Sequence, residues 1–325
     1  MLLFAFILEA ATRLIFAHSL DFSMEMWKYA VQLKRPSSDP EASFVHVPNR
    51  SEFLMGVTVS INSFGLRDRE FSREKPAGTC RVLMLGDSTT LGWGVPVEQT
   101  VAKILERKLN PSSVSGCGRF EVLNGGVGNY GTVQEVAQYR NRDRFLKPDL
   151  VILEYFINDA EPVPRERTPG LLGRSYLLAF AASRYDALLR FSGARPAWKE
   201  YYASLYRADQ PGLRAATRAL DRLADMTRQD GLGLLVALLP DLHDIDTVYP
   251  FVREHDMVKD VLARKGVAAM DLIDSLRGHG PASSLWVTPQ DPHPNGQANE
   301  LIAGQMLPWI LEYLVRAART KTEVQ

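Results

Sequence analysis

The sequence predicts an α/β protein built on a parallel β-sheet. Short apolar segments bounded by turn residues alternate along the chain with longer amphipathic segments, as strands alternate with helices in such folds. The short segments are apolar throughout, which is expected where helices cover both faces of a sheet. With 325 residues, 46% of them apolar, the chain can form one sizeable core with additions, or two small domains.

The predicted elements follow one another in strand and helix order. The strands are residues 81–86, 120–124, 150–155, 232–239 and 267–272. The helices, which have apolar side chains at helical spacing, are residues 97–109, 132–145, 213–229, 256–265 and 297–318. Residues 80–318 are therefore expected to form the main domain, followed by a polar tail at 319–325.

The first 17 residues are apolar apart from Glu9 and Arg13. This run is shorter than the ~20 residues of a membrane-spanning helix, and it lacks the basic leader of a signal peptide. Three interpretations remain open: a signal anchor truncated by a misplaced start codon, an amphipathic surface helix, or a packed N-terminal helix. Its apolar side chains crowd too closely for one helical stripe, which favours the two membrane-related interpretations.

Two further segments lie outside the predicted sheet. Residues 18–79 form an N-terminal extension with a possible extra strand at 57–62. Residues 160–212 form an aromatic-rich insertion that is too long for an ordinary connection. We expect this insertion to shape access to a site at the edge of the sheet, although Trp198, Tyr202 and Leu205 would equally suit a helix that packs against the body.

Charge and cysteine content exclude some functions. Lys plus Arg equals Asp plus Glu at 38 each, so the chain has no positive field for nucleic acid, which is not expected as a partner. The two cysteines, Cys80 and Cys117, lack the paired spacing of a zinc site and are either thiols or one disulfide. No metal or cofactor is implied.

Four segments near the predicted carboxyl ends of strands or before the last helix carry chemistry-bearing residues. Ligands of open α/β sheets bind beyond these ends, so the segments are expected at one edge. Each alone is a weak signal, but together they supply a nucleophile, a base, an orienting carboxylate and oxyanion donors. They are Gly86-Asp87-Ser88-Thr89-Thr90-Leu91-Gly92, Asn124-Gly125-Gly126-Val127-Gly128-Asn129-Tyr130-Gly131-Thr132, Ile157-Asn158-Asp159 and Asp291-Pro292-His293-Pro294-Asn295.

In their order and separation, these four segments resemble the signature blocks of the SGNH hydrolases, also called GDSL esterases and lipases. The resemblance covers the chain from about Arg81 to the last helix. It implies a flavodoxin-like three-layer α/β/α sandwich with a five-stranded parallel sheet, in which Ser88 attacks an ester carbonyl to form an acyl-enzyme. His293 would accept the proton of Ser88, while Asp291 would fix the imidazole tautomer and stabilise the imidazolium.

The same resemblance implies the oxyanion hole. Its donors would be the backbone N–H of Ser88, the side-chain amide of Asn158 and a third N–H from the second segment. Alignment places Asn129 where the family generally has glycine, and Gly128 is the alternative. Because asparagine tolerates unusual φ angles, Asn129 can supply this donor.

The last segment departs from the commonest family pattern, because one residue and not two separates Asp291 from His293. Some members, including polysaccharide acetyltransferase-like ones, resemble this shorter form. If the shorter spacing were not a subfamily feature, Gln290 would occupy the expected position and the orienting role of Asp291 would be in doubt.

The function expected is therefore a serine esterase that cleaves an acyl ester, in particular an O-acetyl ester, of a small molecule or of a cell-envelope or extracellular polysaccharide. A glycan O-acetyltransferase would use the same acyl-enzyme, and a catalytically silent carbohydrate-binding or assembly component is the alternative from another class. Loss of fluorophosphonate labelling at Ser88 would favour the silent component.

In a flavodoxin-like sheet the first two strands are neighbours, which brings Cys80 and Cys117 within reach of a disulfide at the edge opposite the site. Such a bridge would close a loop of about 36 residues and stabilise by ~3 to 4 kcal/mol. It would indicate a cell-envelope or periplasmic, membrane-anchored protein, with a cytoplasmic one as the alternative.

Overall fold

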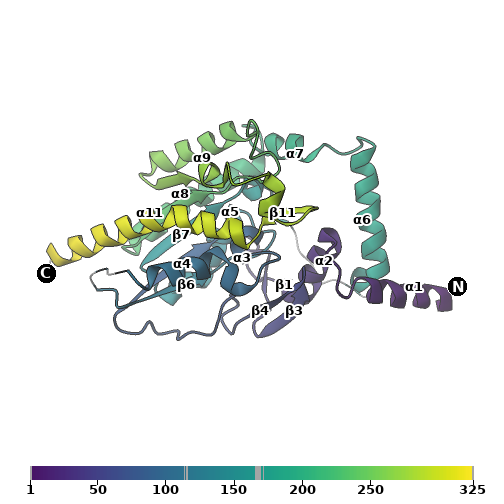
Figure 1. The fold of residues 1–325 in the computed structure, drawn as a ribbon, viewed down its shortest axis with the longest axis horizontal. Coiled ribbons are helices and arrows are strands. Elements are labelled where there is room, and N and C mark those ends of the chain that lie inside the picture. Colours follow the sequence, from purple (N-terminus) through teal and green to yellow (C-terminus); the bar gives the residue numbers. More distant parts are fainter. Residues whose placement is uncertain (1, 113, 115, 165–169, 171, 324–325) are drawn as a thin grey trace.

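A five-stranded parallel sheet forms the centre of the computed structural model, which describes residues 2–112, 114, 116–164, 170 and 172–323 (Figure 1). Neighbouring strands lie in the order β6-β5-β7-β8-β9, which is the 2-1-3-4-5 order of flavodoxin-like folds. The strands are β5 (Thr79–Leu85), β6 (Arg119–Asn124), β7 (Leu150–Tyr155), β8 (Gly233–Leu238) and β9 (Ala268–Asp271). The predicted fold class is confirmed, and all five strands lie within two residues of their predicted bounds.

Helices cover both faces of this sheet. Because successive strand residues point to opposite faces, Leu235 and Ala237 of β8 pack into one apolar core while Leu234 and Val236 pack into the other. The first core includes α4 (Val101–Leu109) and α11 (Gly296–Glu323), and the second includes α8 (Pro211–Gln229) and α9 (Val252–Arg264), with α5 (Thr132–Asn141) beside α8. The three-layer arrangement is therefore as expected.

Helix ends differ from the prediction where polar side chains interrupt the periodicity. Thr100 separates a short 3₁₀ turn, η1 (Val97–Gln99), from α4 and caps that helix by accepting the N–H of Lys103 at 3.4 Å. A second 3₁₀ turn, η2 (Asp143–Leu146), follows α5. The last helix, α11, extends through Glu323, so the residues expected as a polar tail continue this helix as far as they are described.

The N-terminal extension contains one helix and two small antiparallel sheets. Asp21 caps α2 (Phe22–Leu33), and the sheets pair β1 (Lys34–Pro36) with β2 (Phe44–His46) and β3 (Arg50–Leu54) with β4 (Val57–Ile61). The predicted strand at 57–62 is thus one arm of a hairpin. Its two-residue turn, Met55 and Gly56, has positive φ at both positions, as tight hairpins require.

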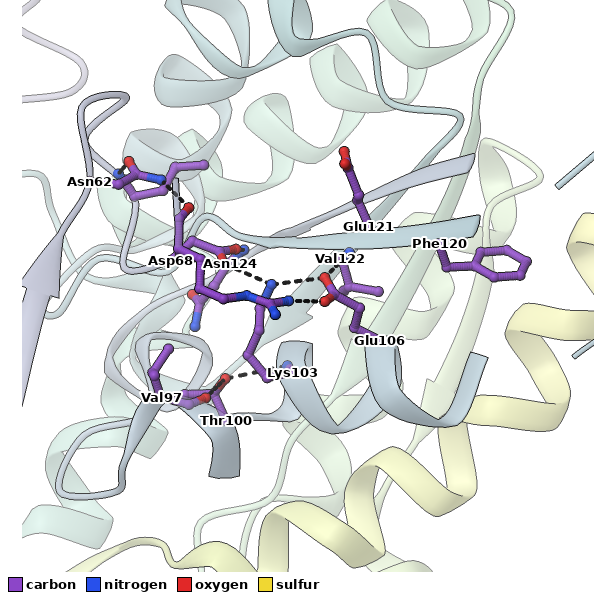
Figure 2. Close-up of polar contacts among 12 residues, drawn as sticks. Asn62, Asp68, Val97, Thr100, Lys103, Glu106, Phe120, Glu121, Val122 and Asn124 are labelled. Atoms are coloured by element: carbon purple, nitrogen blue, oxygen red, sulfur yellow. Dashed lines mark hydrogen bonds and ion pairs between the residues drawn. The ribbon is translucent and has the colours of Figure 1, made fainter. Parts of the chain in front are cut away.

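A buried ion network joins this extension to the sheet (Figure 2). Lys103 of α4 lies 2.7 Å from Asp68 and 3.0 Å from Glu106. The two carboxylates also accept backbone N–H groups of β6, Asp68 that of Asn124 at 3.0 Å and Glu106 that of Val122 at 2.9 Å. The network therefore fixes the carboxyl end of β6, where the second chemistry-bearing segment begins.

The insertion contains η4 (Leu172–Arg174), α6 (Tyr176–Phe191) and α7 (Trp198–Leu205). The α6 helix packs against α2 and the N-terminal α1 (Leu2–Ile15), away from the sheet, whereas α7 returns to the body (Figure 1). Glu9 joins the two outlying helices by accepting the backbone N–H groups of Tyr176 and Leu177, both at 3.0 Å. Residues 1, 165–169, 171 and 324–325 of the predicted segments lie outside the described residues.

Exposed apolar side chains cover much of α1. Leu3, Phe4, Phe6, Leu14 and Ile15 are each more than 60% exposed. No helix within the described residues is both long enough and apolar enough to cross a membrane.

A disulfide joins Cys80 to Cys117, with 5.3 Å between their Cα atoms, so the pairing expected from neighbouring strands is confirmed. Cys80 lies within β5 and not before it, because the strand begins at Thr79. Both cysteines lie near the amino ends of their strands, away from the edge that carries the candidate site.

Short elements complete the chain at that edge. They are α3 (Ser88–Leu91), η3 (Ile157–Ala160), α10 (Ile273–Leu276), η5 (Ala282–Leu285), and the antiparallel pair β10 (Trp286–Thr288) and β11 (Asp291–Pro294).

Candidate active site

Ser88 is the first residue of α3, directly after the turn that ends β5. Asp87 caps this short helix, since its carboxylate accepts the N–H and the hydroxyl of Thr89, both at 2.8 Å. The glycines on either side of Ser88 predict a serine on an open surface turn. In the structure Ser88 is only 6% exposed, so this expectation is wrong. The residue is therefore largely covered by the surrounding structure.

Ser88, His293 and Asp291 form one hydrogen-bonded chain. The Oγ of Ser88 lies 2.8 Å from Nε2 of His293, and Nδ1 of the same ring lies 2.5 Å from Oδ1 of Asp291. Since an ionised carboxylate accepts only, Nδ1 carries the proton and Nε2 is free to accept the proton of Ser88. The hairpin of β10 and β11 presents both residues to α3.

The buried carboxylate and imidazole shift each other's pKa. Burial alone would lower the pKa of His293, but the hydrogen bond and negative charge of Asp291 outweigh it and raise this pKa above its ordinary value. Burial would raise the pKa of Asp291, but the hydrogen bond and charge of His293 keep it below its ordinary value. The pair is therefore built to favour an imidazolium beside an ionised carboxylate.

Trp93, which the sequence analysis did not single out, fixes the second oxygen of this carboxylate. Its indole Nε1–H donates to Oδ2 of Asp291 at 3.0 Å, and Asp291 also accepts the backbone N–H of His293 at 3.1 Å. Gln290 is exposed and makes no comparable contact with the ring. The structure thus places Asp291, and not Gln290, beside His293.

Asn158 lies in η3, after the third central strand, and its side-chain amide donates to Oδ2 of Asp87 at 3.1 Å. Asp87 therefore links the start of the Ser88 helix to the Asn158 amide. Asp87 belongs to the Gly-Asp-Ser segment of the sequence. No role could be assigned to it there, because its contact with the distant Asn158 is visible only in the structure. This contact uses one N–H of the Asn158 amide, and the amide carries a second N–H.

The loop that follows β6 lies directly against the Ser88 helix. A side chain at Gly126 would come within 2.1 Å of the backbone nitrogen of Leu91, and Val127 donates its N–H to the carbonyl of Gly86 at 3.0 Å. Asn129 of this loop is exposed and has φ of 65°, a left-handed conformation that asparagine adopts more readily than most residues.

Gly128, the alternative oxyanion donor, is already engaged. Its N–H donates to Oη of Tyr29 at 2.9 Å, and Tyr29 lies 2.6 Å from Nε2 of His46. Burial lowers the pKa of His46 to about 3, so this ring is neutral, with Nδ1–H directed at the carbonyl of Gly65 and Nε2 accepting from Tyr29. The Gly128 alternative is therefore not supported, and Asn129 remains the candidate.

Lys34 holds the same loop from the other side. Its ammonium donates to the carbonyl of Gly128 at 2.7 Å and to Oδ1 of Asn129 at 2.9 Å, and it lies over the rings of Tyr29 and Phe44. Nothing in the local sequence around Lys34 indicates this contact, because it joins residues about 95 positions apart.

Arg67 of the N-terminal extension binds the carboxyl end of the Ser88 helix. It is 1% exposed and donates to the carbonyls of Leu91 at 2.9 Å, Val95 at 2.6 Å and Gly92. Burial lowers its pKa to about 10, so the guanidinium remains charged at neutral pH. This cation satisfies the carbonyls that α3, one turn long, leaves without helical partners.

Buried acids support the floor of the site. Glu154 accepts the hydroxyl of Thr90 at 2.5 Å, and burial raises its pKa to about 7. Asp159 accepts the hydroxyl of Thr132 at 3.0 Å, and burial followed by the charge of Asp87 raises its pKa well above the usual range. For both groups, burial and the charge of Asp87 favour the neutral acid over the carboxylate.

A cavity of about 190 Å³ opens beside His293. Its walls come from the hairpin, from α2, from the loop after β8 and from α7 of the insertion, including Phe22, Trp198, Tyr202 and His243. The insertion therefore borders the site, as expected, and Trp198 and Tyr202 also pack against the second apolar core. Within the described residues, no group of three His, Cys, Asp or Glu side chains is placed to hold a metal ion.

Comparison with known proteins gives similarity only at the level of solved structures. No protein-family model matches the sequence, and no curated protein matches it. One similar structure is LAE5, an α/β hydrolase enzyme from the metagenome of Lake Arreo, at 17% identity over 75% of this chain and 99% of that one, with a TM-score of 0.49.

A second similar structure is a catalytic mutant of Axe2, an acetylxylan esterase from Geobacillus stearothermophilus, at 16% identity over 71% of this chain and 93% of that one, with a TM-score of 0.47. A third is a protein of the G-D-S-L family from Desulfitobacterium hafniense, at 14% identity over 73% of this chain and 98% of that one, with a TM-score of 0.42. The chain is similar to esterases of the GDSL type. At these identities and TM-scores the similarity decides nothing about its activity, which must be argued from its own site.

Proposed function

We propose that this protein is a serine esterase that cleaves an acyl ester through an acyl-enzyme on Ser88, as SGNH hydrolases do. The observation that carries the proposal is the continuous hydrogen-bonded chain from Ser88 through His293 to Asp291. A structural serine has no need of a histidine whose tautomer is fixed by a buried carboxylate, whereas a nucleophile does.

The reaction follows from this geometry. Ser88 Oγ attacks the ester carbonyl as its proton passes to Nε2 of His293, and the resulting imidazolium is stabilised by Asp291. The N–H groups of Ser88 and Asn129 and the amide of Asn158 stabilise the oxyanion, each by roughly 3 to 4 kcal/mol in comparable sites. The C–O bond then breaks, His293 returns its proton to the departing alcohol, and water activated by His293 releases the acid and frees Ser88.

Fluorophosphonate labelling tests the nucleophile directly. We expect wild-type protein to be labelled at Ser88 and to hydrolyse p-nitrophenyl acetate, whereas Ser88→Ala should lose both properties and keep its melting temperature to within a few degrees. The matched control is Ser283→Ala, an exposed serine, which should behave as wild type. A wild-type protein that folds but resists labelling would instead support a catalytically silent binding component.

The natural substrate that we propose is an O-acyl, in particular O-acetyl, ester of a glycan. Support comes from the aromatic side chains of Trp198 and Tyr202 in the cavity beside His293, since aromatic faces suit sugar rings. A transferase would pass the same acyl group to a second sugar hydroxyl in place of water. Release of free acetate from an acetylated glycan, measured with and without an unacetylated acceptor glycan, distinguishes hydrolysis from transfer.

For location we propose the cell envelope or periplasm, with association to a membrane through α1. The disulfide between Cys80 and Cys117 supports an oxidising compartment, and the exposed apolar side chains of α1 support contact with lipid. Fractionation of the source cells, with thiol counting on the isolated, unreduced protein, tests both parts. Recovery in the cytoplasm with two free thiols would contradict them.

A further inference from the structure

A second Asp-x-His pair lies at the same edge of the sheet. Asp241 and His243 follow the end of β8 and repeat the local geometry of the first pair, since Oδ1 of Asp241 accepts the backbone N–H of His243 at 2.9 Å and lies 2.8 Å from its Nδ1. The contact fixes the ring with Nδ1 occupied, so Nε2 is the atom that can meet a ligand. The triad described above does not use this pair.

The surroundings hold this second pair in place. Asp241 is 5% exposed, and its backbone N–H donates to Oη of Tyr249 at 3.0 Å. The His243 ring stacks on Trp198 with centroids 4.5 Å apart and meets the edge of Trp286 at 5.4 Å. The indole of Trp286 in turn donates to the carbonyl of Leu242 at 3.2 Å. Such support from several elements is what a preorganised binding group requires.

His243 and His293 line one cavity. Among the described residues of its lining are His293 and Thr89, whereas Asn129 and Asn158 lie outside the lining. In the reaction proposed above, His293 protonates the departing alcohol, so the alcohol portion of the ester must lie on the His293 side of Ser88. The carbonyl oxygen must lie toward the asparagines. The cavity is therefore on the alcohol side.

We infer that the Asp241–His243 pair is a specificity-determining binding site for a hydroxyl group on the alcohol portion of the ester, which is a hydroxylated ring of the carbohydrate class. This inference rests on the proposed esterase function. The cavity offers apolar walls from Phe22, Trp198 and Tyr202 and places His243 among them. An alcohol that is apolar throughout has no group for the Nε2 of His243, whereas a sugar ring has apolar faces and hydroxyls at its edge.

The side chain of His243 is one-third exposed, so a ligand in the cavity can reach it. Its role differs from that of His293, because within the described residues its ring forms no hydrogen bond with a serine or cysteine, and it would bind a hydroxyl that does not react. Removing it should therefore weaken selection between alcohols and leave the activation of Ser88 in place.

The test compares two acetyl esters with the same acyl group and different alcohols: p-nitrophenyl acetate and a methyl glucoside that carries one O-acetyl group. For His243→Ala, the ratio of kcat/KM for the sugar ester to kcat/KM for the nitrophenyl ester should fall at least tenfold, mainly through KM of the sugar ester. His243→Gln, which keeps a hydrogen-bonding side chain, should recover part of the ratio. His279→Ala, at an exposed histidine away from the cavity, is the matched control and should keep the wild-type ratio.

Fluorophosphonate labelling of Ser88 in His243→Ala separates this inference from the proposed function. Labelling at the wild-type rate together with the fallen ratio supports the inference. An unchanged ratio would overturn the inference. Equal losses of kcat/KM for both esters together with slower labelling would also overturn it, because His243 would then support the triad. A wild-type protein without labelling would overturn the esterase function and this inference with it. If His243→Ala does not fold, His243→Phe, which keeps a ring against Trp198 but has no hydrogen-bonding atom, is measured in its place and decides by the same criteria.

Discussion

Asp291→Asn is the most informative single substitution, because it keeps the size of a buried side chain and removes its charge. The carboxylate accepts three hydrogen bonds, two from His293 and one from the indole of Trp93. An amide has only one accepting oxygen and places an N–H group against one of these donors. The charge-assisted hydrogen bond to the imidazolium, which forms when His293 takes the proton of Ser88, is lost.

The magnitude follows from that bond. A hydrogen bond to a charged group contributes roughly 1.5 to 3 kcal/mol, which corresponds to about 10- to 10²-fold in rate. If the amide also stabilises the wrong tautomer of His293, with the proton on Nε2, the loss should reach about 10⁴-fold. We therefore expect kcat for p-nitrophenyl acetate to fall by about 10 to 10⁴, with a far smaller change in KM.

The pH profile adds a second readout. His293 acts as the base only when neutral, and Asp291 raises its pKa above the ordinary value of 6.5, so wild-type activity should rise with pH through a midpoint above that value. In Asp291→Asn the opposing effect of burial remains and the charge is gone, so the midpoint should move down. The control is Asp274→Asn, at an aspartate whose side chain is 88% exposed. Retention of more than about a third of wild-type kcat, or a midpoint that does not fall, would refute the assigned role.

Four further substitutions test the rest of the site and the fold. Asn158→Ala should lower kcat by about 10²-fold or more. Asn129→Gly should stay within about tenfold, because it keeps the backbone N–H proposed for the oxyanion and loses only the side-chain contact with Lys34; equal severe losses would reveal a further role for the Asn129 side chain. Trp93→Phe should lower kcat by about tenfold through a less fixed Asp291, and full activity would show that the indole contact is not needed. Cys117→Ser should lower the free energy of unfolding by about 3 to 4 kcal/mol in urea titrations, and a loss below about 1 kcal/mol would contradict the chain-entropy argument.

Local pattern was sufficient for the sheet. Strands buried on both faces are short, apolar and bounded by turn residues, so each of the five could be located from composition alone, as β7 at Leu150–Tyr155 illustrates. The placement of Ser88 and Asn158 at one edge followed from the rule that parallel strands end together, whereas Asp291 reaches that edge on the antiparallel hairpin of β10 and β11. The local pattern did not predict that Ser88 is buried, because the glycines around it indicate a turn but not which residues cover that turn.

Contacts between distant segments explain what the sequence left open. Tyr29 reaches Gly128 across 99 positions, and Trp93 reaches Asp291 across 198. No local periodicity encodes such pairs, and each involves a residue type that is also common in cores. The Asp241–His243 pair is a different case. Its spacing matches that of Asp291 and His293, so a search for repeated Asp-x-His segments after strands would have found it.

The N-terminal extension is the part whose contribution could be least foreseen, and it completes the site in three ways. Arg67 satisfies the carbonyls at the end of the Ser88 helix, Tyr29 takes the N–H of Gly128, and Phe22 lies against the ring of His293 with centroids 5.6 Å apart. A one-turn helix leaves its carbonyls unpaired, and a glycine-rich loop has many accessible conformations. The sheet can therefore bring the reacting groups to one edge, but a second layer of side chains is needed to hold them there. In this chain residues 18–79 supply a large part of that layer, together with Asp87 and Trp93.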